Sequence, residues 1–229
     1  QTFTCELIEK NGKKIEETLA LKFFAGEYRI KTTVISDQET ADTITSELQK
    51  SQYEIADISR KVTQRVPPPP FTTSTLQQAA INQLGYSAKQ TMMIAQKLYE
   101  EGHITYMRTD SVNLSLLSMV EAQKYIQKNF GKDYALPSPR FYKTKNKGAQ
   151  EAHEAIRPTY SEKDPEDLKN SLEPQNYRLY KLIWERMIAC QMQPAIFDSV
   201  KVDIKATHGK SENTYLLRAS GSTLKFDVY

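Results

Sequence analysis

Residues that could do chemistry gather in the stretch GHITYMRTDS, which runs from Gly102 to Ser111. It places the phenol of Tyr106 two residues before the guanidinium of Arg108. In an extended chain, residues two apart point to the same face. A tyrosine oxygen that attacks a phosphodiester needs a cation for its phenolate and for the charge that gathers on phosphorus, and an arginine fork matches phosphate oxygens. The spacing therefore suggests phosphoryl transfer to Tyr106.

The same residues also allow a purely structural interpretation. Most tyrosines are packed rings with a tethered hydroxyl, this chain has 13 of them, and a free phenol has a pKa of about 10. Asp110 could orient Arg108 for catalysis, or the two could form a structural ion pair at the surface. Thr109 and Ser111 could donate hydrogen bonds to flanking phosphates.

A second stretch, QEAHEAIRPT, contains His153, which is one of only three histidines. His153 could donate a hydrogen bond to the scissile phosphate or pass a proton to the leaving oxygen, or it could be an ordinary histidine on a helix surface. A metal site made by His153 and Glu154 is disfavoured, because adjacent helical positions do not share a face.

The segment before that stretch is basic. Lys143 and Lys145 lie there with other cations, next to Phe141 and Tyr142. Basic residues mixed with aromatic ones suit a nucleic-acid backbone, although a solvated loop has the same composition. The net charge of +3 over 229 residues is too small to identify a partner.

The elements that position these residues follow from hydrophobic periodicity and capping signals. Alternation predicts strands near residues 2–9, 19–36, 53–62, 199–207, 214–220 and 222–229. Capping boxes at Ser36, Ser74 and Ser87 predict helix starts, with further starts at Ser115 and Pro174. Gly85, Gly102 and Gly131 are the expected helix ends. Residues 132–150 have the composition of a long surface loop.

These elements predict an α+β chain with a discontinuous β-rich domain, residues 1–66 and 194–229, interrupted by a mostly helical domain over residues 67–193. The run Pro67 to Pro70 marks the first boundary, since four prolines favour a stiff extended segment. The two helices around Gly85 form a helix-turn-helix pattern. That pattern serves DNA contact in some proteins and only packing in many others.

Cysteine content and hydropathy exclude several classes of protein. Cys5 and Cys190 are far apart and lack a C-x-x-C partner, so a thiolate zinc site is disfavoured and two free, buried thiols in a reducing cytosol are expected. No signal-peptide pattern is recognisable in the first residues of this sequence, and no apolar run is long enough to cross a membrane. We expect a cytoplasmic, nucleoid-associated monomer. The chain opens on Gln1 and closes within a strand pattern, which suggests a piece of a longer protein.

GHITYMRTDSVNLS and AHEAIRPT together resemble the type IA DNA topoisomerases. PFTTSTLQQAA and LGYSAKQTMMIAQKLYEEG before the tyrosine, and LYKLIWERMIACQM after it, are similar to the same family in the same order. The resemblance covers essentially the whole chain. It implies an enzyme that cuts one DNA strand through a 5′-phosphotyrosine, passes another strand and reseals, which relaxes negative supercoils without ATP.

By motif position, the resemblance implies that Tyr106 is the nucleophile, that Arg108 stabilises the transition state and that His153 lies near the same phosphate. It places Thr109, Asp110 and Ser111 in or beside the site, and it makes Arg157, within AHEAIRPT, a candidate DNA contact. The helical domain corresponds to the family's domain III, and the β-rich domain corresponds to its domain II, the arch.

The resemblance also implies what this chain does not contain. The Mg²⁺-binding carboxylates of the family belong to a Toprim domain, and much of the single-strand groove belongs to another domain; neither is recognisable here. We therefore expect no metal site in this chain. Its expected partners are DNA and those missing domains, and we do not expect the chain alone to relax supercoiled DNA. The rival hypotheses are a non-catalytic DNA-binding module that uses the helix-turn-helix, and a structural arch that serves gate movement.

Overall fold

The computed structural model describes residues 2–24, 26–142, 154–209 and 212–227 of the chain. They form two compact units, one made of residues 1–63 and 196–225 and the other of residues 64–195 and 226–229. Both helices and antiparallel strands are present, which confirms the predicted α+β class. The chain passes between the units near residues 64 and 195, and the run Pro67 to Pro70 lies just inside the second unit.

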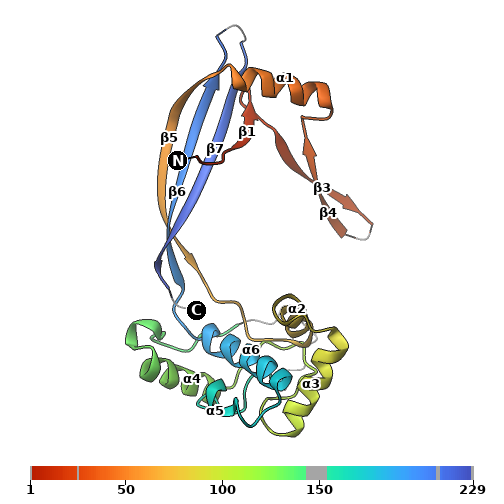
Figure 1. Cartoon of the computed structure of the whole chain (residues 1–229), viewed down its shortest axis with the longest axis vertical. Coiled ribbons are helices and arrows are strands. Elements are labelled where there is room, and N and C mark those ends of the chain that lie inside the picture. Colours follow the sequence, from red (N-terminus) through yellow and green to blue (C-terminus); the bar gives the residue numbers. More distant parts are fainter. Residues whose placement is uncertain (1, 25, 143–153, 210–211, 228–229) are drawn as a thin grey trace. The chain divides into compact units, whose positions relative to one another are not determined.

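The first unit is built on a five-stranded sheet with strand order β2-β1-β7-β6-β5. β1 pairs antiparallel with both β2 and β7. In Figure 1, β5, β6 and β7 are the long strands that run side by side. The strands are β1 (Glu6–Lys10), β2 (Lys13–Lys14), β5 (Gln52–Arg65), β6 (Ala195–Thr207) and β7 (Thr214–Phe226).

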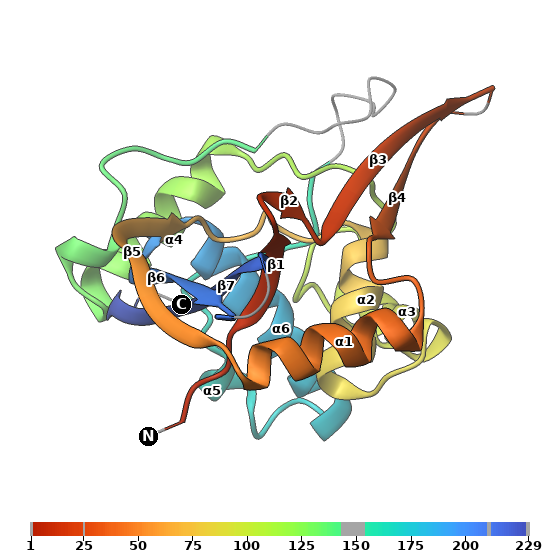
Figure 2. The same cartoon turned by 90° about the horizontal axis from the view of Figure 1, so that it is seen from above.

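A separate hairpin and one helix complete this unit. β3 (Glu16–Phe23) and β4 (Gly26–Thr33) pair antiparallel, with Leu19 opposite Ile30, and both views show the hairpin extending away from the sheet (Figures 1 and 2). α1 (Gln38–Gln49) follows. Its N-cap is Asp37, whose carboxylate accepts from the amide of Thr40. The predicted cap, Ser36, was therefore wrong by one residue; its hydroxyl donates to Asp37 instead.

The core of the first unit is small. It joins Ile44 of α1 to Ile204 and Ala206 of β6 and to Tyr215 and Leu217 of β7. Ile204 and Ala206 belong to the alternating series that the sequence predicted to face one way, and Val202 packs partly buried against the same cluster. Alternate residues of β6 and β7 thus face the same side of the sheet, and α1 packs against that side.

The second unit is helical (Figure 1). α6 supplies much of its core, including Leu179, Ile183, Trp184 and Met187. α2, α3 and α4 pack around it with Leu76, Leu98 and Ile126. The elements are α2 (Thr73–Leu84), α3 (Ala88–Glu100), α4 (Leu116–Asn129), a 3-10 turn (Lys132–Tyr134), α5 (Pro165–Leu168) and α6 (Pro174–Cys190).

Most of the helix ends lie where the capping signals put them. The hydroxyls of Ser87 and Ser115 accept from backbone amides three residues on, and Gly85 takes the left-handed conformation after α2, with φ 71°. The start of α2 differs from the prediction. Its N-cap is Thr72, in a capping box with Thr75, because the side chain of Thr72 reaches the amide of Thr75 and Ser74 already lies inside the helix.

The cysteines are free, as predicted. Cys190 is buried, which raises the pKa of its thiol to about 12, whereas Cys5 is only partly buried, so the expectation of two buried thiols holds for Cys190 alone. Among the described residues, no helix has the length and apolar character needed to cross a bilayer.

Candidate active site

The stretch that carries Tyr106 leaves the end of α3 as an extended segment without regular strand structure. A bridge between Ile104 and Pro158 ties it to a described neighbouring segment. The segment is irregular and is held by individual hydrogen bonds. We call residues 104–111 the tyrosine segment.

Burial alternates along the tyrosine segment around its two chemically important residues. Tyr106 is 48% exposed, and Arg108 and Asp110 are also exposed. The intervening Met107 and Thr109 are 1% and 8% exposed. The phenol and the guanidinium therefore both belong to the solvent-facing side of the segment, as their spacing of two predicts.

The ring of Tyr106 has an aromatic neighbour. Tyr99, in the last turn of α3, meets it edge to face, with ring centroids 5.3 Å apart and an interplanar angle of 68°. This is the arrangement that aromatic quadrupoles favour. The contact restricts the ring of Tyr106 on one side, while nearly half of its surface remains open to solvent.

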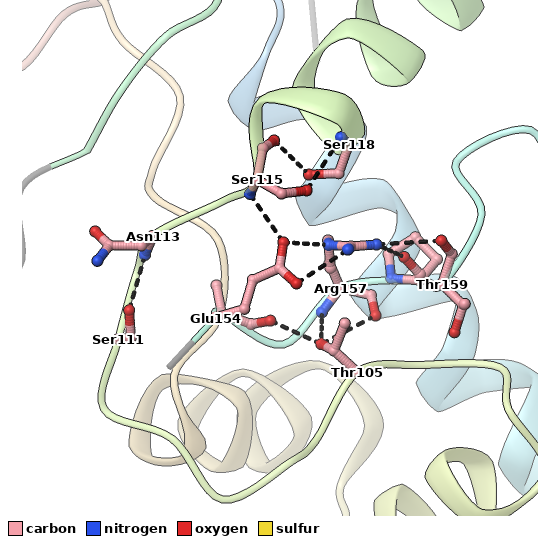
Figure 3. A network of polar contacts seen from close by, with 10 residues as sticks. Thr105, Ser111, Asn113, Ser115, Ser118, Glu154, Arg157 and Thr159 are labelled. Carbon is pink, nitrogen blue, oxygen red and sulfur yellow. Dashed lines mark hydrogen bonds and ion pairs between the residues drawn. The ribbon is translucent and has the colours of Figure 1, made fainter. Parts of the chain in front are cut away.

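On the N-terminal side of Tyr106, the segment is held by Thr105 (Figure 3). The hydroxyl of Thr105 donates to the carbonyl of Ala155 at 2.7 Å and accepts from the amide of Arg157 at 3.0 Å. The amide of Thr105 donates to the carbonyl of Arg157 at 2.9 Å. The residue directly before the phenol is thus fixed to the AHEAIRPT stretch, some 50 residues away in the sequence.

Glu154 and Arg157 stiffen that stretch through a bidentate ion pair (Figure 3). Nε and Nη2 of Arg157 donate to the two carboxylate oxygens at 2.8 and 3.0 Å, and Nη1 donates to the carbonyls of Pro158 and Thr159. Burial by itself would raise the pKa of Glu154, but the bonds from Arg157 and from the amide of Ser115 outweigh it and hold that pKa below its usual value.

These contacts argue against the DNA contact predicted for Arg157. Its side chain is 12% exposed, and its donors are directed at Glu154 and at backbone carbonyls within the chain. A guanidinium bonded in this way has little capacity left for a phosphate. Its geometry fits the positioning of Thr105, and through it of Tyr106.

On the C-terminal side, Thr73 of α2 holds the tyrosine segment. The hydroxyl of Thr73 donates to the carbonyl of Met107 at 2.8 Å and accepts from the amide of Thr109 at 2.9 Å. The amide of Thr73 donates to the carbonyl of Thr109 at 2.9 Å. Hydrogen bonds from two distant elements therefore bracket Tyr106 and Arg108.

The remaining predicted site residues differ in their availability. Thr109 and Ser111 are 8% and 0% exposed, and their hydroxyls accept from the amides of Ser111 and Asn113. Their contacts with phosphate stay predictions. Asp110 is exposed. The predicted residues His153, Lys143 and Lys145 lie outside the described residues.

The described beginning of the basic segment is tied to the helical core. Tyr142 donates to the carbonyls of Pro67 and Cys190 at 2.9 and 3.0 Å, and burial raises the pKa of its phenol. Arg140 donates to the carbonyl of Cys190 at 3.1 Å. These two residues act as structural anchors at the point where the segment begins.

A magnesium site does not fit the residues around Tyr106. Within the described ranges, no three His, Cys, Asp or Glu side chains are grouped as metal ligands would be. The carboxylate of Glu154 is taken up by Arg157 and by the amide of Ser115. Asp110 alone supplies one exposed carboxylate in the tyrosine segment, and Mg²⁺ sites in proteins usually use more than one ligand group.

Sequence reasoning missed three residues at this site. Glu154 had been weighed only as a metal ligand; its ion pair with Arg157 lies in an irregular stretch, where the spacing rule for helices gives no signal. Tyr99 could have been suspected from its place one turn before Gly102. Thr73 gave no signal, because its partners lie 34 and 36 residues further along the chain.

The whole chain matches one protein family. The family model described as DNA topoisomerase covers residues 2–229, which includes both units and the tyrosine segment. This chain belongs to the DNA topoisomerase family. The resemblance to the type IA topoisomerases that was drawn from the tyrosine motif is thereby confirmed.

Curated members of the topoisomerase family cover the chain at high identity. DNA topoisomerase 1 of Rickettsia bellii (strain RML369-C) is 45% identical over 237 residues, which is 100% of this chain and 27% of the relative. DNA topoisomerase 1 of Helicobacter pylori (strain ATCC 700392 / 26695) is 46% identical over 209 residues, 88% of this chain and 28% of the relative. The chain thus spans little more than a quarter of the length of these relatives.

A solved topoisomerase structure has the same fold. Full-length topoisomerase I from Thermotoga maritima superposes with a TM-score of 0.66 at 30% identity, covering 98% of this chain and 35% of that one. The likeness extends over both units, so the α+β architecture described above is that of the corresponding part of a bacterial topoisomerase I.

Proposed function

We propose that this chain is the strand-cleaving portion of a type IA DNA topoisomerase, with Tyr106 as its nucleophile. The observation that carries the proposal is the half-exposed phenol of Tyr106 on the same open side of the segment as Arg108. Both residues are held there by a backbone that Thr105 and Thr73 fix from either end. Family membership supplies DNA as the substrate.

The proposed reaction exchanges one phosphoester for another. The phenol oxygen of Tyr106 loses its proton and attacks a backbone phosphorus; the new tyrosyl–phosphorus bond forms as the bond from phosphorus to the 3′ oxygen breaks. The released 3′ oxygen takes up a proton and the 5′ end stays on the tyrosine. Attack by the 3′ hydroxyl reverses every step, so the covalent intermediate keeps the bond energy and resealing requires no ATP.

Arg108 is proposed to stabilise the charge in this exchange. Negative charge grows on the non-bridging phosphate oxygens and on the phenol oxygen as the bonds change, and a guanidinium placed beforehand lowers the energy of that state without having to reorganise. Asp110, exposed two residues further on, would orient Arg108. His153 remains a proposed phosphate contact or proton carrier, and Lys143 and Lys145 remain proposed DNA contacts.

The other parts of the reaction are proposed to reside elsewhere in a longer enzyme. Mg²⁺, which would neutralise phosphate charge when bound, finds no suitable ligand set among the described residues, and we derive no step through it. The first unit is proposed to act as the arch of the family and the second as the domain that carries the nucleophile. The chain alone is expected to bind single-stranded DNA weakly, with strong salt dependence, and not to relax supercoiled DNA.

The test is a chimera in which this chain replaces the matching segment of Rickettsia bellii DNA topoisomerase 1, to which it is 45% identical. The chimera is incubated with Mg²⁺ and single-stranded DNA labelled on the 5′-phosphate side of the cut, and then denatured. We expect a covalent protein–DNA adduct, and relaxation of negatively supercoiled plasmid. Tyr106→Phe should abolish both while leaving DNA binding within about twofold.

Tyr99→Phe is the matched control, because it removes a hydroxyl from the neighbouring ring and keeps the edge-to-face contact. It should form the adduct at close to the unmodified rate. An adduct that persists in Tyr106→Phe would refute the assignment of the nucleophile. A chimera that binds DNA yet never forms an adduct would instead support the alternative of a non-catalytic DNA-binding module.

A further inference from the structure

Thr73 has an unusual set of bonds for the first residue of a helix. Its hydroxyl accepts from the amide of Thr109 at 2.9 Å and donates to the carbonyl of Met107 at 2.8 Å. The carbonyl of Thr109 also lies 3.1 Å from this hydroxyl. Its own amide, which no helical carbonyl can reach, donates to Thr109 at 2.9 Å. Thr73 and Thr109 therefore pair as in a sheet ladder, with a hydroxyl in place of one carbonyl.

The bonded groups lie on both sides of Arg108. Met107 precedes it and Thr109 follows it, so one side chain fixes the backbone on either flank of the exposed guanidinium. The side chains of Met107 and Thr109 are themselves buried. The direction in which Arg108 leaves the backbone is thus set by Thr73, just as Thr105 sets that of Tyr106.

The anchor is rigid for local reasons. Thr73 is the first residue of α2 and directly follows the N-cap Thr72. Leu76 and Ala80 of the same helix are fully buried in the core of the unit. A β-branched side chain also has few χ1 rotamers to choose from, so the hydroxyl of Thr73 stays directed at the tyrosine segment.

We propose that Thr73 is a positioning residue for DNA cleavage, which holds Arg108 beside Tyr106 by bonding the backbone on both sides of it. The inference rests on the proposed function of Tyr106 and Arg108. Thr73 would touch neither DNA nor the reacting atoms. A misplacement of about 1 Å in a reacting group is enough to slow an enzyme by about 100-fold.

The first experiment examines the clamp in the 229-residue chain itself. Hydrogen exchange is followed at the amide of Thr109 in the unmodified protein, in Thr73→Val and in Thr73→Ser. Valine keeps the shape and removes every hydrogen bond of the hydroxyl, so exchange at Thr109 should accelerate at least about 10-fold while amides within α6 are unchanged. Serine should restore most of the protection. An unchanged rate in Thr73→Val would overturn the clamp.

The second experiment measures single-turnover cleavage by the chimera at saturating DNA. Thr73→Val should slow adduct formation about 10- to 100-fold with the dissociation constant for DNA within about twofold, because Arg108 is displaced rather than lost. Thr73→Ser should stay within about threefold of the unmodified rate. Rescue by serine separates the hydroxyl bond from general packing.

Thr75→Val is the matched control, since it breaks the capping box of the same helix turn and leaves the bonds of Thr73 to residues 107 and 109 intact. It should lower stability yet cleave at the unmodified rate. Equal slowing in Thr75→Val and Thr73→Val would reduce Thr73 to a helix-stability effect and overturn the inference. An unmodified chimera without any adduct would refute the proposed function, and the role of Thr73 would fall with it.

Discussion

The ion pair between Glu154 and Arg157 shows how a residue near a reaction centre can act without touching substrate. It joins both carboxylate oxygens to the guanidinium, and the backbone of Arg157 exchanges three hydrogen bonds with Thr105. Its energetic role is therefore to keep the loop before Tyr106 in one conformation. A charge-assisted bidentate pair suits this role, because it specifies direction as well as distance.

We predict that Glu154→Gln lowers the free energy of unfolding of the helical unit by about 1–3 kcal/mol, the cost of replacing charge-assisted bonds to a largely buried guanidinium. Trp184 is the only tryptophan in the chain and is buried in this unit, so its fluorescence during denaturant unfolding provides the measurement. Glu166→Gln is the control. Its pair with Lys169 is exposed on both sides, and it should change stability by less than about 1 kcal/mol.

The same pair has a predictable pH dependence. The pKa of Glu154 is lowered in the folded protein, so its contribution to stability is complete above the unfolded-state pKa of about 4.3 and is lost as the pH falls through the folded-state pKa. The difference in free energy of unfolding between the unmodified chain and Glu154→Gln should therefore be constant near neutrality and should shrink towards zero below about pH 4. A gap that widened on acidification would contradict this sign.

At the scale of elements, the end of α3 determines where the tyrosine segment begins. Gly102 has a φ of 75°, a left-handed conformation that costs a residue with a Cβ about 1–2 kcal/mol. Its amide donates to the carbonyl of Tyr99 at 2.9 Å, and the amide of His103 donates to Leu98 at 2.8 Å. This turn ends the helix and directs the chain into the extended segment four residues before the phenol.

Gly102→Ala is expected to destabilise the helical unit by about 1–2 kcal/mol, from the strained φ alone, because no atom beyond its two chain neighbours lies within 4 Å of where its Cβ would be. The readout is again the Trp184 unfolding transition. Gly221→Ala, in β7 of the other unit, also meets open space and has no left-handed φ, so it should leave that transition unchanged. Equal shifts in the two variants would show that backbone strain at Gly102 is not the cause.

At the scale of the whole molecule, the described residues form two separate apolar clusters. The larger one surrounds α6 in the helical unit, and the smaller one joins α1 to β6 and β7. Hydrophobic burial is the main favourable term in folding, so each unit has a driving force of its own. The small core of the β-rich unit suggests that this unit is the less stable of the two.

A matched pair of cavity substitutions tests this. Ile183→Ala, in the larger cluster, should lower the midpoint of the Trp184 transition by an amount equivalent to about 2–5 kcal/mol. Ile204→Ala, in the smaller cluster, should leave that midpoint unchanged. It should instead cause the strand signal in circular dichroism to be lost at a lower denaturant concentration. If Ile204→Ala moved the Trp184 midpoint as far as Ile183→Ala does, the units would unfold as one.

The sequence by itself determined the local features of this protein. The spacing of two between Tyr106 and Arg108, the caps at Ser87 and Ser115 and the helix end at Gly85 depend on neighbouring residues, and the structure agrees with them. The cap of α1 was placed one residue early and that of α2 two residues late, because Asp37 and Thr72 compete with nearby serines of similar capping propensity. Local sequence does not decide between such neighbouring candidates.

Only the tertiary structure decided how the site is held. The bonds of Thr73 to Met107 and of Thr105 to Ala155 join residues 34 and 50 positions apart, and the pairing of Arg157 with Glu154 turns a predicted DNA contact into an internal support. Hydrogen-bond partners of this kind follow from how the helices and the extended segment pack together. Residue type and spacing specify what a side chain can do, whereas the packed chain fixes which groups lie within its reach.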